Sequence, residues 1–430
     1  MTTHADLLAR HRAVLPSWMA LYYDEPIALV RGEGRYVWDA EGARYLDFFG
    51  GILTTMTAHA LPEVVEAVRG QAGRILHTST LYLIESQIEL AEEIAALVPM
   101  DDAKVFFTTS GTEANEAALL LACTARRSNQ ILAMRNSYHG RSFAAMAITG
   151  NRGWSASSLS PVQTSYVQGG YRYRSPWRDL SDDEYIAAGV ADLVDVLDTT
   201  TAGDVACMIA EPIQGVGGVA VPPDGFFGAM KRVLDDHGIL FVSDEVQTGW
   251  GRTGDHFWGY EAHGIVPDLL TFAKGVGNGL ALGGVVGRAE VMDHLTANSI
   301  STFGGNPLAA CGALATLRYV LDNDLQRNAR ERGQQLGDGL QRITRAHRWV
   351  AEVRGRGLMW AIETVNPSGI DPAPERAEAL HEATREQGLL VGRGGLYGNV
   401  LRVAPPLNVS AAEVDEGLEH VEAAVRSVGS

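Results

Sequence analysis

Lys274 is the residue of this sequence that is best placed for covalent chemistry. Lysine and arginine together number 35, and only three of these residues are lysines. Lys104 follows two aspartates and Lys231 occupies a polar position of a helical pattern, so both indicate surface residues. Lys274 instead closes the apolar run DLLTFA and precedes a glycine-rich stretch. Burial there lowers the pKa of the amine and makes it nucleophilic, although a lysine that extends into solvent is the simpler alternative.

Two carboxylates close other apolar runs in the same way. Asp244 follows ILFVS, and Glu211 follows VACMIA. Because neighbouring residues of a strand point to opposite faces, only one of Asp244 and Glu245 can face a given site. A buried aspartate needs a cationic partner, which is either an arginine such as Arg252 or a protonated heterocyclic nitrogen. For Glu211, the simpler alternative is a carboxylate capped by nearby amides.

An anion-binding turn and an aromatic residue complete this set. Ser110, Gly111, Thr112 and Glu113 open a helical pattern and have the S-x-x-E form of a capping box. The amides and hydroxyls of a helix N-terminus also bind phosphate, and the two roles can share one terminus. Tyr138 follows another apolar run and is a candidate for stacking on a planar ring, with an ordinary half-buried tyrosine as the alternative.

The segment 249–254, GWGRTG, matches the GxGxxG pattern of dinucleotide-binding turns. That pattern requires a strand directly before it and a helix directly after it, and here DHFWGY follows. We therefore do not expect a nicotinamide cofactor.

The elements that must position these residues alternate between strands and helices. Apolar runs predict buried parallel strands at 105–111, 130–136, 205–212, 238–245 and 268–275. Helical patterns separate several of them, at 113–127 and at 226–238, where Gly238 is a C-cap residue. This alternation predicts an α/β fold with a mostly parallel sheet, in which ligands gather at the carboxyl ends of the strands.

The two ends of the chain predict a smaller α+β unit. Residues 35–51 have the alternation and turn glycines of an antiparallel hairpin. Towards the other end, the patterns indicate a long helical stretch at 307–345 and a further helix at 373–387. Strand-bearing segments are indicated at 353–363 and 398–407. We expect a large domain at 56–305 and a small domain built from 1–55 and 306–430.

Composition excludes several classes of protein. The net charge of -17 disfavours nucleic acid or an anionic membrane as a partner, because phosphate contacts need concentrated Lys and Arg. The three cysteines form no CxxC or Cys/His cluster, so neither a disulfide framework nor a metal site is expected. The first twenty residues lack a signal-type apolar segment, and no run is long enough to span a membrane. We expect a soluble cytoplasmic protein.

A Schiff-base lysine, a carboxylate for a ring nitrogen, a phosphate cradle and a stacking aromatic are together what pyridoxal 5'-phosphate requires. The chain moreover resembles the class III aminotransferases, the ω-transaminase and ornithine aminotransferase group of fold type I, from about residue 25 to 410. The motifs that carry the resemblance are TTSGTEANEAALLLA, YHGRSFAAMAITG, EPIQGVGGVAVPP, SDEVQTGWGRTG, TFAKGVGNGLALGG, STFGGNPLAACGAL and LRVAPPL.

The resemblance implies a role for each residue of the cofactor site. Lys274 would form the Schiff base, and Asp244 would pair with the pyridine nitrogen. Thr302 would reach the phosphate bound in the partner subunit of a homodimer whose active sites are shared. The other implied cofactor-binding residues are the phosphate-binding Ser110, Gly111 and Thr112, then Tyr138 and Val246 on the two ring faces, Gln247 near the ring hydroxyl, and His139.

The resemblance also implies how substrates bind. Arg402 would grip a substrate carboxylate, a task that suits the planar guanidinium. Glu211 would pair with Arg402 when an ω-amine occupies the site, and Arg141 would offer a second carboxylate anchor. The small-molecule partners would be an amino acid or ω-amine donor and a 2-oxo acid acceptor such as pyruvate, glyoxylate or 2-oxoglutarate.

The implied reaction is ping-pong transamination, in which the freed Lys274 amine moves the proton. A lyase, an epimerase or a decarboxylase with the same cofactor is the alternative, and a catalytically silent binding protein is a further one. The segment 58–62 reads AHALP where many members have GHxHP, and 52–57 is also unusual. Both segments are expected near the substrate, so the choice of substrate stays open.

Overall fold

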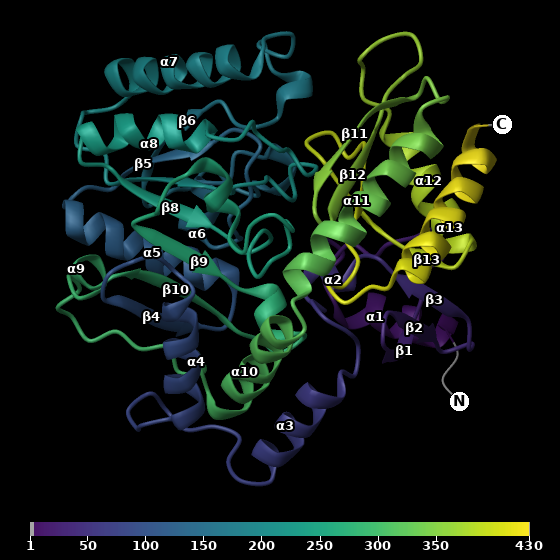
Figure 1. Cartoon of the computed structure of the whole chain (residues 1–430), viewed down its shortest axis with the longest axis horizontal. Helices are drawn as coiled ribbons and strands as arrows, with labels where there is room; N and C mark the ends of the chain where they lie inside the picture. The colour runs from purple at the N-terminus through teal and green to yellow at the C-terminus, as the bar shows by residue number, and fades with distance from the viewer. Residues whose placement is uncertain (1–3, 430) are drawn as a thin grey trace.

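The computed structural model describes residues 4–429, and within them a large sheet has the strand order β4-β10-β9-β8-β7-β5-β6 (Figure 1). Strands β5 to β9 pair in parallel along this order, while β10 runs antiparallel to both of its neighbours. The sheet is therefore mostly parallel, as predicted. Its strands are β4 (Ala103–Thr108), β5 (Gln130–Met134), β6 (Gln163–Val167), β7 (Cys207–Ala210), β8 (Leu240–Asp244), β9 (Leu269–Phe272) and β10 (Gly283–Arg288).

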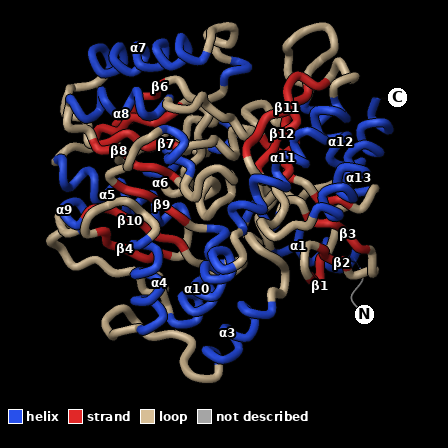
Figure 2. Tube along the Cα trace, viewed as in Figure 1, coloured by secondary structure: helices blue, strands red, loops and turns tan. Residues whose placement is uncertain are grey.

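The strands are continuous apolar runs because helices cover both faces of this sheet. On β5, Ile131 and Ala133 pack with helix α5 (Gly111–Arg126). The alternate residues Leu132 and Met134 pack on the other side with α7 (Asp182–Thr200) and α8 (Phe226–Asp236). Figure 2 shows α7 at the top of the view and α8 beneath it, beside the strands of this sheet.

Two details of the sheet differ from the prediction. Strand β4 pairs with antiparallel β10 rather than with a parallel neighbour, and its first four residues are not fully buried, because it lies at the edge. Strands β6 and β10 were not predicted, since β6 is only partly buried and β10 contains three glycines. The helix ending before Gly238 is confirmed, and that glycine adopts φ 64°.

The two chain ends meet in a second region with two smaller sheets (Figure 1). The predicted hairpin is formed by β2 (Tyr36–Asp39) and β3 (Arg44–Asp47), flanked by β1 (Leu29–Glu33). Strand β13 (Leu389–Leu390), from the far end of the chain, pairs in parallel with β3. The other sheet has the order β11-β12-β15-β14 and consists of β11 (Val350–Arg356), β12 (Met359–Thr364), β15 (Val400–Val403) and β14 (Gly392–Gly394).

The single helical stretch predicted at 307–345 is two helices, α10 (Pro307–Asp322) and α11 (Leu325–Thr344). Asp324 breaks the stretch by adopting φ 47°, and its side chain then caps α11 by accepting from the Arg327 amide. Polar Asn323 and Asp324 favour such a turn over a helix interior. The predicted helix at 373–387 is α12 (Pro374–Glu386).

The remaining helices complete the two regions: α1 (His4–Val14), α2 (Gly50–Leu53), α3 (Pro62–Ala72), α4 (Glu85–Ala96), α6 (Phe143–Ala147), α9 (Ala289–Met292) and α13 (Ala411–Gly429). Among the described residues, no helix combines the length and the apolar character needed to cross a membrane. The domain limits at 55 and 305 stay a prediction. Residues 1–3 and 430, at the outer ends of that division, lie outside the described residues.

Candidate active site

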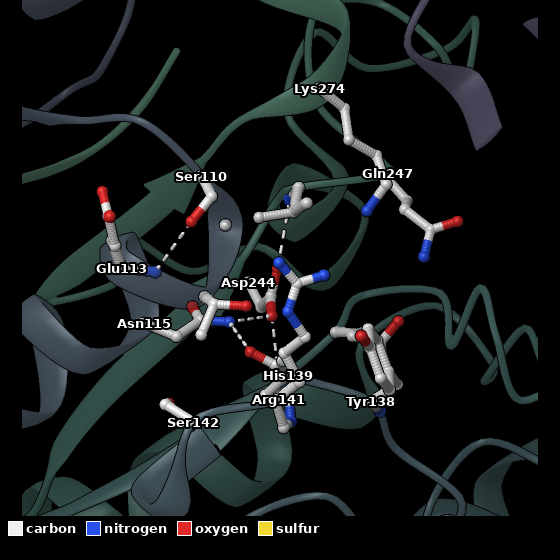
Figure 3. A pocket seen from close by; sticks show the side chains of 15 residues that line it. Ser110, Glu113, Asn115, Tyr138, His139, Arg141, Ser142, Asp244, Gln247 and Lys274 are labelled. Carbon is white, nitrogen blue, oxygen red and sulfur yellow. Dashed lines mark hydrogen bonds and ion pairs between the residues drawn. The ribbon is translucent and has the colours of Figure 1, made fainter. Parts of the chain in front are cut away.

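A cavity of about 390 Å³ opens where the carboxyl ends of β4, β5, β7, β8 and β9 converge. All the predicted site residues line it except Thr302 and Arg402. Figure 3 shows Lys274, Asp244 and Tyr138 around this pocket, although they come from three different strand ends. The prediction that ligand-binding side chains gather at this edge of the sheet is therefore confirmed in geometry.

Asp244 is buried at the base of the pocket, and its carboxylate is held from several sides (Figure 3). Its Oδ2 accepts a hydrogen bond from Asn115 Nδ2 at 2.8 Å and lies 2.7 Å from His139 Nδ1. Its Oδ1 accepts from the Val246 amide at 3.1 Å. The suggested salt bridge to Arg252 is wrong, because that guanidinium donates to backbone carbonyls elsewhere.

Glu245 points to the other face, as the strand alternation predicts. Its carboxylate accepts from the backbone amides of Gly259 and Tyr260 at 2.8 Å each and from the Thr248 hydroxyl. Burial raises the pKa of Glu245 to about 7 against the opposing effect of these hydrogen bonds. Asp244 alone of this pair therefore faces the pocket.

Lys274 is half-buried among charged groups. Burial lowers the pKa of its amine, while the nearby carboxylates of Asp244 and Glu211 raise it and Arg402 lowers it further. Its backbone adopts φ 49°, a left-handed conformation that is uncommon for a residue with a side chain and that concentrates at functional sites. A desolvated amine next to two carboxylates is poised for attack on a carbonyl.

The N-terminus of α5 forms the predicted anion cradle. The Ser110 side chain caps the helix by accepting from the Glu113 amide at 3.3 Å. The Glu113 carboxylate accepts from the Thr109 amide rather than from that of Ser110, so the capping box is shifted by one residue. The cradle also requires glycines, because a Cβ on Gly140 would lie 2.6 Å from the Thr112 hydroxyl.

Two walls enclose the pocket. A Cβ on Gly111 would lie 3.1 Å from Val246 Cγ1, so this glycine lets the cradle and the Val246 wall approach closely. Tyr138 lies near the opposite rim (Figure 3) and makes an edge contact with Trp154, with ring centroids 5.3 Å apart. Arg141 is exposed at the pocket edge.

Glu211 is capped by backbone amides, as the simpler alternative proposed. Its two oxygens accept from Tyr138 and Gly215, each at 2.9 Å. Burial raises the pKa of Glu211, and the Asp244 charge adds to this, while His139 opposes it. No ion pair joins Glu211 to Arg402 in the described part of the chain, although the Glu211 charge raises the pKa of Arg402.

Arg402 on β15 is buried behind this pocket, and its Nε and Nη1 have no hydrogen-bond partner among residues 4–429. The guanidinium lies over the Phe49 ring at 5.2 Å from its centroid, and Tyr22 lies near enough to raise its pKa. Burial lowers the pKa of Arg402. Nothing in the sequence pattern indicated Tyr22 or Phe49, because they reach Arg402 only through the fold.

The unusual segment 52–57 contacts the loop that follows Lys274. Its Thr57 amide donates to Asn278 Oδ1 at 3.1 Å, and a Cβ on Gly275 would lie 2.7 Å from Met56 Sδ. The backbone from 50 to 53 adopts four successive left-handed residues, with φ between 53° and 69°. Thr302 is exposed in the loop before α10 and does not line this pocket.

A desolvated lysine, a buried carboxylate and an anion cradle around a flat pocket define an enzyme of the pyridoxal phosphate class. The donor set fits this cofactor. His139 Nε2 and Gln247 Oε1 are buried without partners among the described residues, and the α5 amides face the pocket at the cradle.

The chain belongs to the class III aminotransferases, because residues 19–425 match the family model "Aminotransferase class-III". Alanine–glyoxylate aminotransferase 2 homolog 2, a mitochondrial protein of Arabidopsis thaliana, is 39% identical over 414 residues, which are 95% of this chain and 85% of that protein. The alanine/serine racemase of Pyrococcus horikoshii is 32% identical over 431 residues, which are 98% and 90% of the two chains.

Solved structures agree with this assignment. A thermostable (S)-enantioselective ω-transaminase from Thermomicrobium roseum has a TM-score of 0.90 at 35% identity, over 99% of this chain and 98% of that one. An amine transaminase from an uncultivated Pseudomonas species, in its pyridoxal phosphate-bound form, has a TM-score of 0.90 at 29% identity, over 97% and 98%. The protein is therefore a pyridoxal phosphate-dependent aminotransferase of fold type I.

Proposed function

We propose that this enzyme moves an amino group from an amino acid or ω-amine donor to a 2-oxo acid, with Lys274 as the proton carrier. The proposal rests mainly on the desolvated Lys274 amine near the carboxylates of Asp244 and Glu211. Arg402 is buried behind them, with its Nε and Nη1 unpaired among the described residues. Pyridoxal phosphate, when bound, supplies an electron sink for the bond that breaks at the amine carbon. Lys274 would carry the proton between that carbon and C4′ of the cofactor, and Asp244 would keep the pyridine nitrogen protonated.

The other predicted residues bind and orient. Ser110, Gly111 and Thr112 hold the phosphate through the helix terminus. Tyr138 and Val246 hold the cofactor ring between their side chains, with Gln247 and His139 at its edge. The shape of the pocket supports these roles, since all of these side chains line it.

Substrate selection rests on the charges behind the ring. Arg402 binds a carboxylate, because a buried guanidinium without partners is stabilised by an anion that fills its donors. Glu211 neutralises Arg402 when the substrate presents no carboxylate there, and Arg141 binds a second carboxylate at the rim. The Arabidopsis relative's name makes alanine and glyoxylate the first donor and acceptor to test.

The activity is tested by a donor–acceptor panel. Purified holoenzyme is mixed with alanine, β-alanine, 4-aminobutyrate, ornithine and a simple amine, each against glyoxylate, pyruvate and 2-oxoglutarate. The proposal expects amino transfer that depends on the 2-oxo acid and needs a carboxylate in at least one partner. Turnover of a donor without any acceptor would contradict it.

A racemase is the second candidate, favoured by the similarity to the Pyrococcus alanine/serine racemase. The same panel separates the two activities. A racemase converts L-alanine to D-alanine without a 2-oxo acid, whereas an aminotransferase consumes acceptor in equal amount.

A homodimer with shared active sites is part of the proposal. Apolar side chains are exposed along 75–83, among them Leu83 at 93%, and again at Ile300 and Phe303. His77 contacts Phe303 with ring centroids 5.0 Å apart, so the two segments form one surface that includes Thr302. A second copy of the chain covers such a surface. Light scattering of the purified protein should give twice the chain mass, and Thr302→Ala should weaken cofactor binding.

A cytoplasmic location is also proposed, supported by three cysteines that are all unpaired. Fractionation of the source cells with an antibody against the chain tests it.

A further inference from the structure

Two charged side chains lie on one face of the β11-β12-β15-β14 sheet. In the register of β12 and β15, Ala361 pairs with Arg402 and Glu363 pairs with Val400. Because alternate residues share a face, Glu363 and Arg402 point to the same side as these two apolar neighbours. Ala361 and Val400 pack there against residues of the loop after β7. Glu363 is 0% exposed and Arg402 is 5% exposed, so both charges lie inside an apolar contact.

The two charges differ in how they are satisfied. Glu363 receives hydrogen bonds from Arg354 Nη1 at 2.6 Å, from Arg174 Nε at 2.8 Å and from the Tyr171 hydroxyl at 2.7 Å. Asn399 adds a longer one at 3.3 Å. Arg402, on the same face, keeps two of its three guanidinium nitrogens without a partner among the described residues.

Arg354 extends this cluster to the active site. Its Nη2 and Nε donate to the Gly218 carbonyl at 2.7 and 3.0 Å. Gly218 belongs to the loop 215–219, whose first amide, that of Gly215, caps Glu211. The Val216 carbonyl of the same loop accepts from the Gly395 amide, and the preceding Gly394 lies beside both this carbonyl and the Arg402 side chain. The loop thus joins Glu363 to both charges of the substrate side.

We propose that Glu363 is a positioning residue for substrate carboxylates, acting through Arg354 and the loop 215–219 on Glu211 and Arg402. It rests on the proposed function, in that Arg402 binds a carboxylate. Because Arg354, Arg174 and Tyr171 occupy the lone pairs of Glu363, this carboxylate does not compete with substrate for the nearby Arg402. The docked loop also holds Glu211 at its amide cap, so the two substrate-side charges keep their spacing.

The test uses Glu363→Gln in the full holoenzyme, with Glu352→Gln as the matched control. Glu352 also pairs with Arg354, at 2.8 Å, but it is partly exposed. In Glu363→Gln we expect KM for the 2-oxo acid and Kd for the unreactive carboxylate valerate to rise about tenfold or more. The affinity for pyridoxal phosphate and kcat at saturation should stay within about twofold, because no cofactor contact changes. In the control Glu352→Gln, KM for the 2-oxo acid and Kd for valerate should equal the wild-type values.

Two further variants keep the inference testable. Tyr171→Phe removes one donor without removing the charge, so it should fold if Glu363→Gln does not, and it should raise the valerate Kd by a few-fold. In an Arg402→Gln background, Glu363→Gln should change the valerate Kd no further, since its effect passes through Arg402.

Unchanged valerate Kd and KM in the folded variants would overturn the inference, as would equal rises in Glu352→Gln. If instead wild-type enzyme does not bind valerate or transfer amino groups, the proposed function itself fails and this inference fails with it. Additive effects in the Arg402→Gln background would also contradict it.

Discussion

The backbone amide of Tyr138 donates to Glu211 Oε1 at 2.9 Å, so the residue proposed to stack on the cofactor ring is joined to the carboxylate proposed to face the substrate. Tyr138 follows β5 and Glu211 follows β7, and these two strands are neighbours in the sheet. The second oxygen of Glu211 is held by the Gly215 amide. One continuous set of contacts would thus position cofactor and substrate in the proposed mechanism, and the functional predictions below depend on it.

Lys274→Ala should abolish turnover while the cofactor still binds. Loss of a positioned proton carrier lowers the rate by about 10²–10⁴-fold, and loss of the covalent link adds to that. Steady-state kinetics gives the rate, and borohydride reduction followed by mass spectrometry shows whether cofactor is attached. Lys104→Ala, a surface lysine paired with Asp293, is the control and should behave as the wild type. Near-normal activity of Lys274→Ala would contradict the mechanism.

Arg402→Met should weaken substrate binding and increase the stability of the fold. Without the guanidinium, KM for the 2-oxo acid should rise about tenfold or more. The cofactor-free variant should be more stable to urea, by about 1–4 kcal/mol, because an incompletely paired buried charge is replaced by an apolar side chain.

Arg354→Met is the matched control for that measurement. Arg354 is buried too, but it is fully paired with Glu363 and carbonyl groups. Its removal breaks a buried ion pair and leaves Arg174 as the remaining cationic partner of Glu363, which should destabilise the protein by up to about 3–5 kcal/mol. If both variants change the free energy of unfolding in the same direction, hydrogen-bond satisfaction does not distinguish these two arginines.

Glu245 should make the fold less stable as the pH rises towards neutrality. Burial raises its pKa from 4.5 to about 7 in the folded protein, so between these values the folded chain keeps a proton that the unfolded chain has lost. The stabilising contribution is therefore complete below pH 4.5 and is lost as the pH rises through about 7.

Urea unfolding of the cofactor-free protein from pH 5 to 8 measures this effect. Within the window, the wild type should lose about 1.4 kcal/mol per pH unit from this group. Glu245→Gln has no proton to lose there and should show a shallower slope. Identical slopes in the two proteins would mean that Glu245 does not titrate in this range.

Much of the site could be predicted because it lies at the ends of apolar strands. Lys274 stands out because the other two lysines of the chain lie in polar surroundings. Asp244 stands out because only one of two adjacent carboxylates can face the pocket. In a mostly parallel sheet, strand ends meet at one edge, so local patterns place these residues together. The long stretch 307–345 was mispredicted because its period hardly changes across the turn at Asp324, where polar side chains rather than periodicity decide the break.

The amino-acid sequence by itself determined the alternating elements, the nucleophile and the cofactor cradle, since each depends on residues close together in the chain. Tertiary structure alone decided the surroundings of Arg402, because Tyr22 and Phe49 reach it from the opposite end of the chain. It likewise decided that Glu363 is saturated while Arg402 is not. Hydrogen-bond satisfaction depends on which distant donors the fold brings within about 3 Å, and no local pattern encodes that.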